Sequence, residues 1–307
     1  MTTLVFGHKS PDTDSTGSPI LWAWYLNEIE GEDAEPALLG EPNTEAAFML
    51  KYWDLPKPTV IADVKDDQPC VIVDTNNPAE LPENINSADV RAIIDHHRLV
   101  GGIETRAPLD ITLRPLACTA TIMLDLMSDE AYEKMPKGMK GAALTCILSD
   151  TLEFRSPTTT PHDQATAERL AKDLNLDMAD YAAEMFAAKS DVSDFSDAEL
   201  LRMDSKEFAM DETKLRVSVL ETTAPRMVLE RKDSLMQAMQ TVASEDGVDH
   251  VLLFVVDILN EEATLLVPNE TVKTIAEKSF DTTVEGDTVV LPGVMSRKKQ
   301  IIPNLTM

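Results

Sequence analysis

The chain has 307 residues, of which 43% are hydrophobic and 26% charged, and its formal net charge at pH 7 is −27. This is the composition of a globular protein with a sizeable core, and the acidic excess argues against a nucleic-acid-binding surface, which needs a basic footprint, and against a membrane-surface role. No apolar run reaches the ~18 residues of a membrane span and the N-terminus lacks a signal-peptide pattern, so we expect a cytoplasmic protein.

The first predicted strand, Leu4-Val5-Phe6, leads into a polar loop before a buried helix expected at 20–26. Residues 7–15 of this loop read Gly-His-Lys-Ser-Pro-Asp-Thr-Asp-Ser and carry one imidazole and two carboxylates: His8, Asp12 and Asp14. The two aspartates repel one another unless a positive group lies between them. A helix-capping turn explains only part of this set, so we favour one or two metal ions.

Apolar strand-like runs alternate with helical patterns through the first half of the chain. The runs lie at 36–39, 70–74 and 90–97, and helices are expected near 44–53, 118–128, 138–149, 162–174 and 177–189. This alternation predicts βαβ units. The predicted fold class is therefore α/β, with a mainly parallel, doubly wound sheet in the N-terminal domain.

Polar residues end several of these runs. Asp74 closes one strand, Asp95-His96-His97 closes another, and Asp150 follows the helical run 142–148. Because the carboxyl ends of parallel strands meet at one crevice, we expect these side chains to lie near the first loop. If the strand continued through both histidines, their side chains would point to opposite faces, one as a metal ligand and the other as a donor to the substrate.

A short polar stretch near residue 190 divides the chain. We predict an N-terminal domain at 1–189, a flexible linker at 190–195, and a smaller C-terminal α/β domain with a mixed sheet at 196–307. In that second domain, strands are expected at 214–221, 250–256 and 263–267, and helices near 227–244 and 269–279.

The C-terminal tail has a positive net charge, opposite in sign to that of the whole chain. From Val289 onward there is no acidic residue, although the whole chain has 54 acidic and 27 basic residues, and three cations are consecutive: Arg297, Lys298 and Lys299. The tail is either a solvated basic turn or a phosphate clamp, in which arginine gives bidentate contacts and lysine a point charge. Lys206 is a weaker candidate for the same role.

The candidate metal ligands comprise four carboxylates and two imidazoles: His8, Asp12, Asp14, Asp74, His96 and Asp150. Mixed oxygen and nitrogen ligation suits Mn²⁺, and also Co²⁺, Mg²⁺ or Zn²⁺. The three cysteines lie in or beside apolar runs and form no CxxC pair, which favours reduced thiols over a zinc site. Six ligands exceed one tetrahedral ion, and two ions about 3.5–4 Å apart with a bridging carboxylate would use all six.

These motifs, together with Ser149-Asp150-Thr151-Leu152 and the tail segment Ser296-Arg297-Lys298-Lys299-Gln300, closely resemble the family II, manganese-dependent inorganic pyrophosphatases of the DHH phosphoesterase superfamily. The Asp-His-His triplet alone indicates the superfamily. The tail combined with Gly-His-Lys is much more specific. The resemblance runs from the first strand to the tail.

The resemblance implies hydrolysis of pyrophosphate to two orthophosphates by a water or hydroxide that bridges two Mn²⁺ ions per subunit. It assigns His8 and Asp12 to one ion, Asp14, His96 and Asp150 to the other, and Asp74 to both. It assigns four residues to the substrate. His97 would be a hydrogen-bond and proton donor, and Lys206, Arg297 and Lys298 would hold the phosphates. It also implies a further Mg²⁺ arriving with pyrophosphate, a homodimer, and an active site between two domains that open and close.

One segment departs from the family pattern. Asp74 is followed by Thr75-Asn76-Asn77, where the family often has His-Asn-Glu. The ligand count survives, so the difference bears on metal preference and rate. The N-terminal domain has no long insertion that could house a nucleotide-sensing module, so we expect the unregulated form.

Two other functions stay open. Other DHH phosphoesterases, such as an exopolyphosphatase or an oligonucleotide exonuclease, usually carry a Gly-Gly-Gly-His-like element in the second domain. Here the glycines after residue 200 are isolated, at Gly247, Gly286 and Gly293. A non-catalytic metal-binding protein on the same fold is the remaining alternative.

Overall fold

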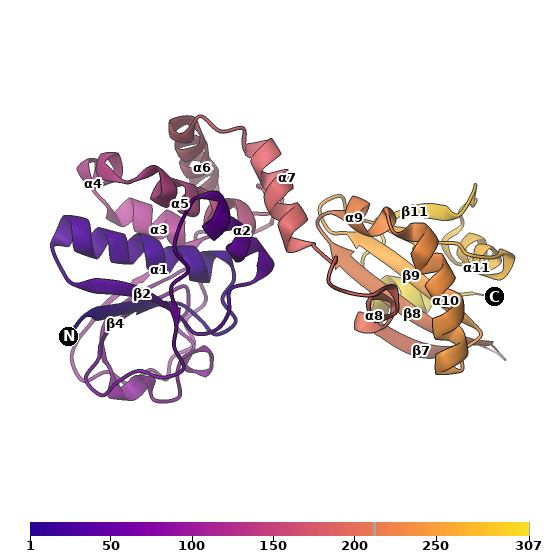
Figure 1. Ribbon diagram of the computed structural model, residues 1–307, viewed down its shortest axis with the longest axis horizontal. Helices are drawn as coiled ribbons and strands as arrows, with labels where there is room; N and C mark the ends of the chain where they lie inside the picture. Colours follow the sequence, from indigo (N-terminus) through magenta and orange to yellow (C-terminus); the bar gives the residue numbers. More distant parts are fainter. Residues whose placement is uncertain (211–212, 307) are drawn as a thin grey trace. The chain divides into compact units, whose positions relative to one another are not determined.

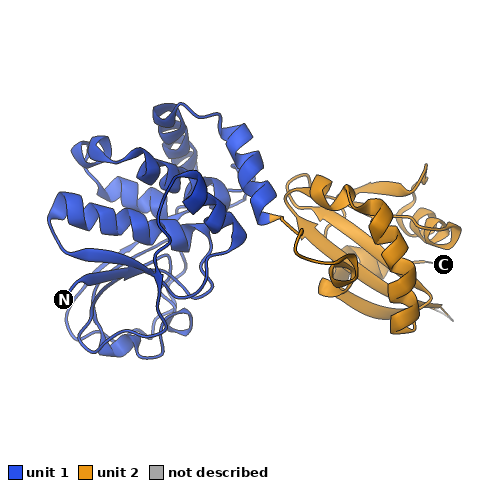
Figure 2. Cartoon of the chain, viewed as in Figure 1, with its two compact units in different colours: residues 1–189 blue, residues 190–307 orange. Residues whose placement is uncertain are grey.

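A computed structural model describes residues 1–210 and 213–306. Residues 211, 212 and 307, the last being the end of the predicted basic tail, lie outside it. The chain divides into two compact units, 1–189 and 190–307 (Figure 2). Within the described residues, no helix combines the length and apolar character needed to cross a membrane.

Unit 1 is built on a parallel sheet of six strands in the order β3-β2-β1-β4-β5-β6, which confirms the predicted α/β class. The strands are β1 Thr3–Phe6, β2 Ala34–Leu38, β3 Thr59–Val60, β4 Pro69–Val73, β5 Asp89–Asp95 and β6 Asp110–Leu113. The sequence did not indicate β3 and β6. Both are short edge strands without a fully buried position, so they lack the apolar run that marks β4.

The helices of unit 1 follow the predicted pattern with two differences. They are α1 Thr13–Tyr25, α2 Thr44–Tyr52, α3 Thr119–Leu126, α4 Asp129–Lys134, α5 Lys137–Asp150, α6 Pro161–Leu174 and α7 Met178–Lys189. The short helix α4 was not predicted. Helix α1 begins well before Ile20, because Oδ1 of Asp12 accepts a hydrogen bond at 2.9 Å from the backbone N–H of Ser15 and caps the helix there.

The two faces of this sheet are covered differently. Helices α1, α3 and α5 lie on one face, where α1 contacts both other helices (Figure 1). On the other face, Phe6 and Ile72 pack against Leu81 and Ile85, which belong to an irregular segment containing two short 3₁₀-helices, Pro78–Glu80 and Ile85–Ser87. The strand order reverses between β1 and β4, and ligands of such sheets bind in the crevice beyond the strand ends at this point.

A close backbone approach shapes the loop at this crevice. A Cβ atom on Gly7 would lie 2.0 Å from Oγ of Ser15, so only glycine fits between β1 and α1. Ser15 Oγ accepts a hydrogen bond at 2.7 Å from the backbone N–H of His8. The first turn of α1 and the end of β1 are therefore fixed against one another.

Unit 2 contains a mixed sheet of five strands in the order β11-β10-β9-β8-β7, with β8 and β9 parallel and the other pairs antiparallel. The strands are β7 Ser205–Met210, β8 Thr213–Thr222, β9 His250–Asp257, β10 Glu262–Leu266 and β11 Thr288–Pro292. The helices are α8 Asp197–Met203, α9 Pro225–Leu229, α10 Lys232–Asp246 and α11 Glu270–Phe280, followed by a π-helix Arg297–Ile301 and α12 Ile302–Asn304.

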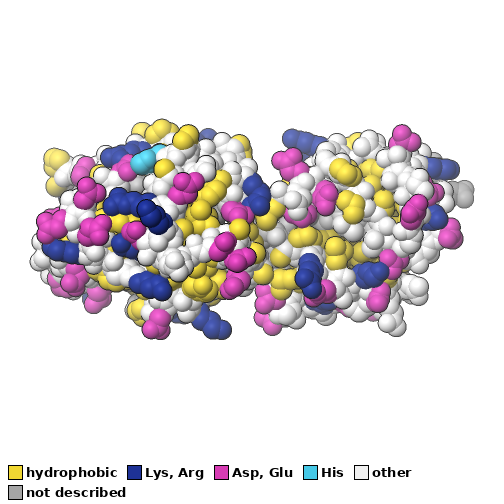
Figure 3. All heavy atoms as spheres, turned by 90° about the horizontal axis from the view of Figure 1, so that it is seen from above, with side chains coloured by type: hydrophobic (Ala, Val, Ile, Leu, Met, Phe, Trp, Pro, Cys, Tyr) yellow, Lys and Arg dark blue, Asp and Glu magenta, His cyan; other side chains and the backbone are white. Residues whose placement is uncertain are grey.

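The central strand β9 separates two cores in unit 2. Its alternate residues Leu252, Phe254 and Val256 belong to one core, and Val251, Leu253 and Val255 to the other. The predicted helix at 227–244 is in fact two helices, α9 and α10. The break lies at Arg231, whose guanidinium pairs with Asp197 at 2.6 Å. On the face in Figure 3, basic side chains are dispersed among acidic and apolar ones.

Candidate metal centre

The loop after β1 supplies the first ligand group. Nδ1 of His8 donates to the carbonyl oxygen of Lys9 at 2.7 Å, which leaves Nε2 for the crevice. This Nε2 lies 3.6 Å from Oδ2 of Asp12 and 3.4 Å from Oδ2 of Asp74. The three ligand atoms lie within 4.8 Å of one another, so they can hold one ion.

Asp74 lies at the centre of the site. It directly follows β4, is 1% exposed, and has a positive φ of 57°, a left-handed conformation that aspartate tolerates better than most residues. Its two oxygens face different partners: Oδ2 faces His8, and Oδ1 lies 3.3 Å from Nε2 of His96. Thr119 Oγ1 also donates to Oδ1 at 3.2 Å. The carboxylate is therefore oriented as a bridge between two groups.

The second ligand group comes from three elements. Asp14 lies in the first turn of α1, His96 follows β5, and Asp150 ends α5, and their ligand atoms also lie within 4.8 Å of one another. Nδ1 of His96 donates to the carbonyl oxygen of Leu116 at 3.2 Å, which leaves its Nε2 facing the crevice, as in His8. Asp14 accepts 2.7 Å and 2.6 Å hydrogen bonds from Thr119 N–H and Ser18 Oγ.

One oxygen of this group is suited to a cation. Oδ2 of Asp150 is buried and, within the described part of the chain, has no hydrogen-bond partner. A buried carboxylate oxygen without a partner is costly, and a metal ion would satisfy it. The oxygen and nitrogen donors, the bridging carboxylate and this oxygen together fit a pair of divalent ions.

The electrostatics of these side chains agree with this fit. Burial and the charge of Asp74 raise the pKa of Asp14 to about 7. Burial, followed by the charges of Asp14 and Asp74, holds the pKa of Asp150 well above its usual range. Burial would also raise the pKa of Asp74, but hydrogen bonds from His8 and His96 outweigh burial and lower it. The four carboxylates repel one another, and a bound cation would relieve this repulsion, so the site favours cation binding.

His97, which is not one of the six predicted ligands, lies beside them: its Nδ1 is 3.8 Å from Oδ1 of Asp74, and it forms a third group of ligand atoms with Asp74 and His96. Strand β5 ends at Asp95, so the strand alternation expected for the two histidines does not apply, and their rings lie 4.2 Å apart. Nδ1 of His97 donates to Oδ1 of Asp95 at 2.9 Å. Asp95, which is fully buried, also accepts from Nδ2 of Asn76 at 2.5 Å. The Asp95 carboxylate thus orients His97 and leaves its Nε2 available.

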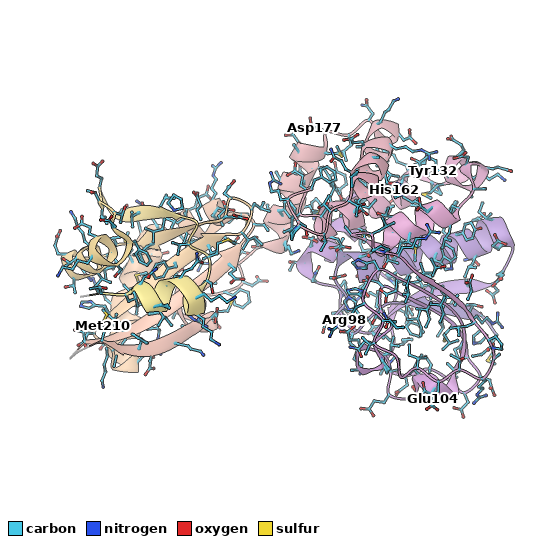
Figure 4. The ribbon with its side chains drawn as sticks, turned by 180° about the vertical axis from the view of Figure 1, so that it is seen from behind. Arg98, Glu104, Tyr132, His162, Asp177 and Met210 are labelled. Carbon is cyan, nitrogen blue, oxygen red and sulfur yellow. The ribbon has the colours of Figure 1, made fainter. Side chains whose placement is uncertain are left out.

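The site opens into a cleft of about 590 Å³. Its lining includes four of the six ligands, His97, and the segment 115–117. It also includes Arg98 and Thr158, which the sequence reasoning missed. Figure 4 shows Arg98 in the loop after β5. Its position directly after Asp-His-His was the signal that could have identified this cation.

Comparison with known proteins gives the same picture over the whole chain. The model of the DHH family, N-terminal domain, matches residues 2–149, and that of the DHHA2 domain matches 183–307. A probable manganese-dependent inorganic pyrophosphatase of Lactobacillus helveticus is 36% identical over 304 residues, covering 98% of this chain and 97% of the relative. One of Staphylococcus carnosus is 36% identical over 305 residues, covering 99% and 98%.

A solved structure extends the match to three dimensions. The crystal structure of a Methanococcus jannaschii putative family II inorganic pyrophosphatase superposes with a TM-score of 0.62 at 31% identity, covering 99% of this chain and 98% of the other. The chain belongs to the family II, manganese-dependent inorganic pyrophosphatases. The resemblance inferred from the motifs is confirmed.

Residues 75–77, the segment that departs from the family pattern, form hydrogen bonds to residues next to the cleft. Thr75 Oγ1 donates to Glu80 Oε2 at 2.9 Å, and Oδ1 of Asn76 accepts from the backbone N–H of Val100 at 2.7 Å. Through Asn76 this segment is tied both to Asp95 and to the loop that carries Arg98. The bonds next to His97 thus come from Asn76, the position that matches the family pattern, whereas Thr75 and Asn77, the positions that differ, bond to Glu80 and to the backbone N–H of Ala79.

The phosphate-binding cations predicted from the family pattern lie in unit 2. Arg297 begins the π-helix of the tail, and its Nη1 lies 2.7 Å from Oδ1 of Asp204, next to the start of β7. Lys206 on β7 and Lys298 are both exposed. Gln300 Oε1 accepts from the backbone N–H groups of Met295 and Ser296, each at 3.0 Å, and so holds the turn before Arg297.

Mn²⁺ binding is expected to release protons. Burial would lower the pKa of His8, but hydrogen bonds to Asp12 and Asp74 raise it to about 11. For His96, burial is likewise outweighed, mainly by Asp74, and the pKa rises to about 9. Both rings are therefore protonated at neutral pH without metal, whereas a metal ion needs the free nitrogen. Affinity should rise with pH, and calorimetry in buffers of different ionisation heat should detect protons released. Binding without proton release would contradict this prediction.

Proposed function

We propose that this chain hydrolyses inorganic pyrophosphate to two orthophosphates at a dinuclear metal site. The observation that carries the proposal is the arrangement of Asp74, whose two oxygens face two separate groups of ligand atoms at the switch point of a parallel sheet. The names of the relatives give the substrate, since those with 36% identity over nearly the full chain are described as manganese-dependent inorganic pyrophosphatases.

Each residue of the site has a role in this proposal. His8 and Asp12 would hold one ion, Asp14, His96 and Asp150 would hold the second, and Asp74 would contribute to both. When bound, the two ions would supply the Lewis acidity that activates water near neutral pH. His97, oriented by Asp95, donates a hydrogen bond to a phosphate oxygen and a proton to the leaving phosphate.

The cations complete the proposed substrate site. Arg297 presents a planar pair of donors to phosphate oxygens, whereas Lys206 and Lys298 act as point charges. They offset the repulsion between a chain of net charge −27 and a polyanionic substrate. Against such a background, local cations decide whether pyrophosphate can approach at all.

The finer expectations of the sequence are kept as part of the proposal. We propose two Mn²⁺ ions per subunit, replaceable by Co²⁺, Mg²⁺ or Zn²⁺, and a further Mg²⁺ that enters with pyrophosphate. The assignment of two ions is supported by the two ligand groups that share the neighbourhood of Asp74. A homodimer and a cytoplasmic location stay predictions.

The function is tested by metal removal and substrate comparison. EDTA treatment should abolish phosphate release from pyrophosphate, and Mn²⁺ or Co²⁺ should restore it. Pyrophosphate should be turned over faster than tripolyphosphate or a short oligonucleotide. Preference for tripolyphosphate would indicate an exopolyphosphatase, and preference for the oligonucleotide an exonuclease. Tight Mn²⁺ binding without hydrolysis of any of the three would indicate a non-catalytic protein.

A further inference from the structure

A buried glutamate outside the proposed ligand set lies between two of its segments. Glu45, in the first turn of α2, is fully buried. A glutamate is rarely buried unless it is paired, and a buried carboxylate without partners is costly. Its partners therefore indicate why this position is a glutamate.

Both hydrogen-bond donors to Glu45 adjoin metal-ligand positions. Oε1 accepts from Oγ1 of Thr13 at 2.6 Å and also from Oγ of Ser149. Thr13 lies between Asp12 and Asp14 at the start of α1, and Ser149 directly precedes Asp150 at the end of α5. One carboxylate oxygen thus joins two segments that are far apart in the sequence. Thr13 precedes Glu45 by 32 residues, and Ser149 follows it by 104 residues.

The other oxygen of Glu45 has a countercharge. Oε2 lies 3.2 Å from Nζ of Lys189, the last residue of α7. Lys189 is also placed by its carbonyl oxygen, which accepts from Thr44 Oγ1 at 3.4 Å. Removing one partner of a buried ion pair is costly, because the remaining charge is left uncompensated. The buried carboxylate thus has an opposite charge beside one oxygen, while its other oxygen accepts both hydroxyl hydrogens.

The arrangement opposes a repulsion within the site. Asp14 and Asp150 belong to one group whose ligand atoms lie within 4.8 Å of one another, and like charges this close repel, which acts to separate the start of α1 from the end of α5. Glu45 accepts from a hydroxyl in each of these segments and draws them together. The hydrogen bonds act on the backbone beside the ligands and not on the ligand oxygens.

We propose that Glu45 is a positioning residue of the metal centre: it holds the Asp12–Asp14 segment and Asp150 in register for the second ion. This inference rests on the metal site proposed above. It adds a residue that touches neither the ions nor the substrate and acts through Thr13 and Ser149. Partners of metal ligands are usually worth about 10- to 100-fold in metal affinity.

The test measures Mn²⁺ affinity of the metal-free protein by calorimetry, with thermal unfolding as a separate readout. Glu45→Ala should weaken Mn²⁺ binding about 10- to 100-fold. The matched control is Trp53→Phe. Trp53 caps the same helix α2, and its Nε1 donates to Tyr181 at 2.8 Å and Thr145 at 3.1 Å, with neither bond adjoining a ligand. This control should lower the unfolding temperature and leave Mn²⁺ affinity unchanged.

Milder variants keep the test decisive if Glu45→Ala does not fold. Glu45→Gln retains an acceptor oxygen and should lose less affinity than removal of both donors in Thr13→Val/Ser149→Ala. Adding Glu45→Gln to that double variant should cost little more, because the shared bonds are already absent. Wild-type Mn²⁺ affinity in the double variant would overturn the inference alone. Failure of the wild-type protein to bind Mn²⁺ would instead overturn the metal site.

Discussion

Asp74→Ala is expected to abolish Mn²⁺-dependent pyrophosphate hydrolysis, with turnover falling by more than about a thousandfold. Loss of a single electrostatic group in an active site commonly costs about 10²–10³ in turnover, and Asp74 faces both ligand groups. Its removal also leaves the Nε2 atoms of His8 and His96 without the carboxylate that both face. Phosphate release at saturating Mn²⁺ and Mn²⁺ binding to the metal-free protein should both be measured.

A second carboxylate in unit 1 provides the control for this variant. Asp173 accepts from Tyr132 at 2.9 Å and Lys140 at 3.1 Å, and neither partner lines the cleft. Asp173→Ala should therefore keep wild-type turnover and Mn²⁺ binding. Far-UV circular dichroism separates loss of the site from loss of the fold. Wild-type turnover in Asp74→Ala would refute the dinuclear mechanism.

The sequence was sufficient to predict that the six candidate ligands lie close together, because each one lies at or near the end of a recognisable element. Asp74 and His96 end apolar runs that are buried strands, and the loop at 7–15 joins a strand to a helix. Parallel strands bring such positions to one edge. Residues far apart in the chain could therefore be assigned to one crevice from the order of strands and helices alone.

Other parts of the site and fold carried no such signal. Glu45 is a single acid in a segment without a motif, and Asp95 belongs to the Asp-His-His triplet but had no role of its own assigned; only the structure shows that both are buried and what they accept from. The strand that carries Lys206 is an edge strand without a buried side chain, so its pattern does not differ from that of a loop. Burial and pairing of lone acids depend on tertiary contacts that sequence periodicity does not report.

Arg297→Ala is expected to lower turnover by about 10²–10³-fold, the usual cost of removing a donor that stabilises developing charge. Arg297→Lys keeps the charge but loses the planar pair of donors, so it should fall between the wild type and Arg297→Ala. Steady-state kinetics with pyrophosphate at fixed Mn²⁺ and Mg²⁺ would measure both variants. Mn²⁺ affinity should be unchanged, since no ligand is altered.

Lys299→Ala is the matched control, because Lys299 is exposed and lies on the same π-helix two residues after Arg297. It should retain wild-type kinetics, whereas general loss of positive charge would affect both variants alike. The Arg297 side chain is 16% exposed and its partner Asp204 is 56% exposed, so thermal unfolding of both variants should be measured to separate a loss of stability from a loss of phosphate binding. Equal activity of Arg297→Ala and Lys299→Ala would show that the basic tail is a solvated turn and not a phosphate clamp.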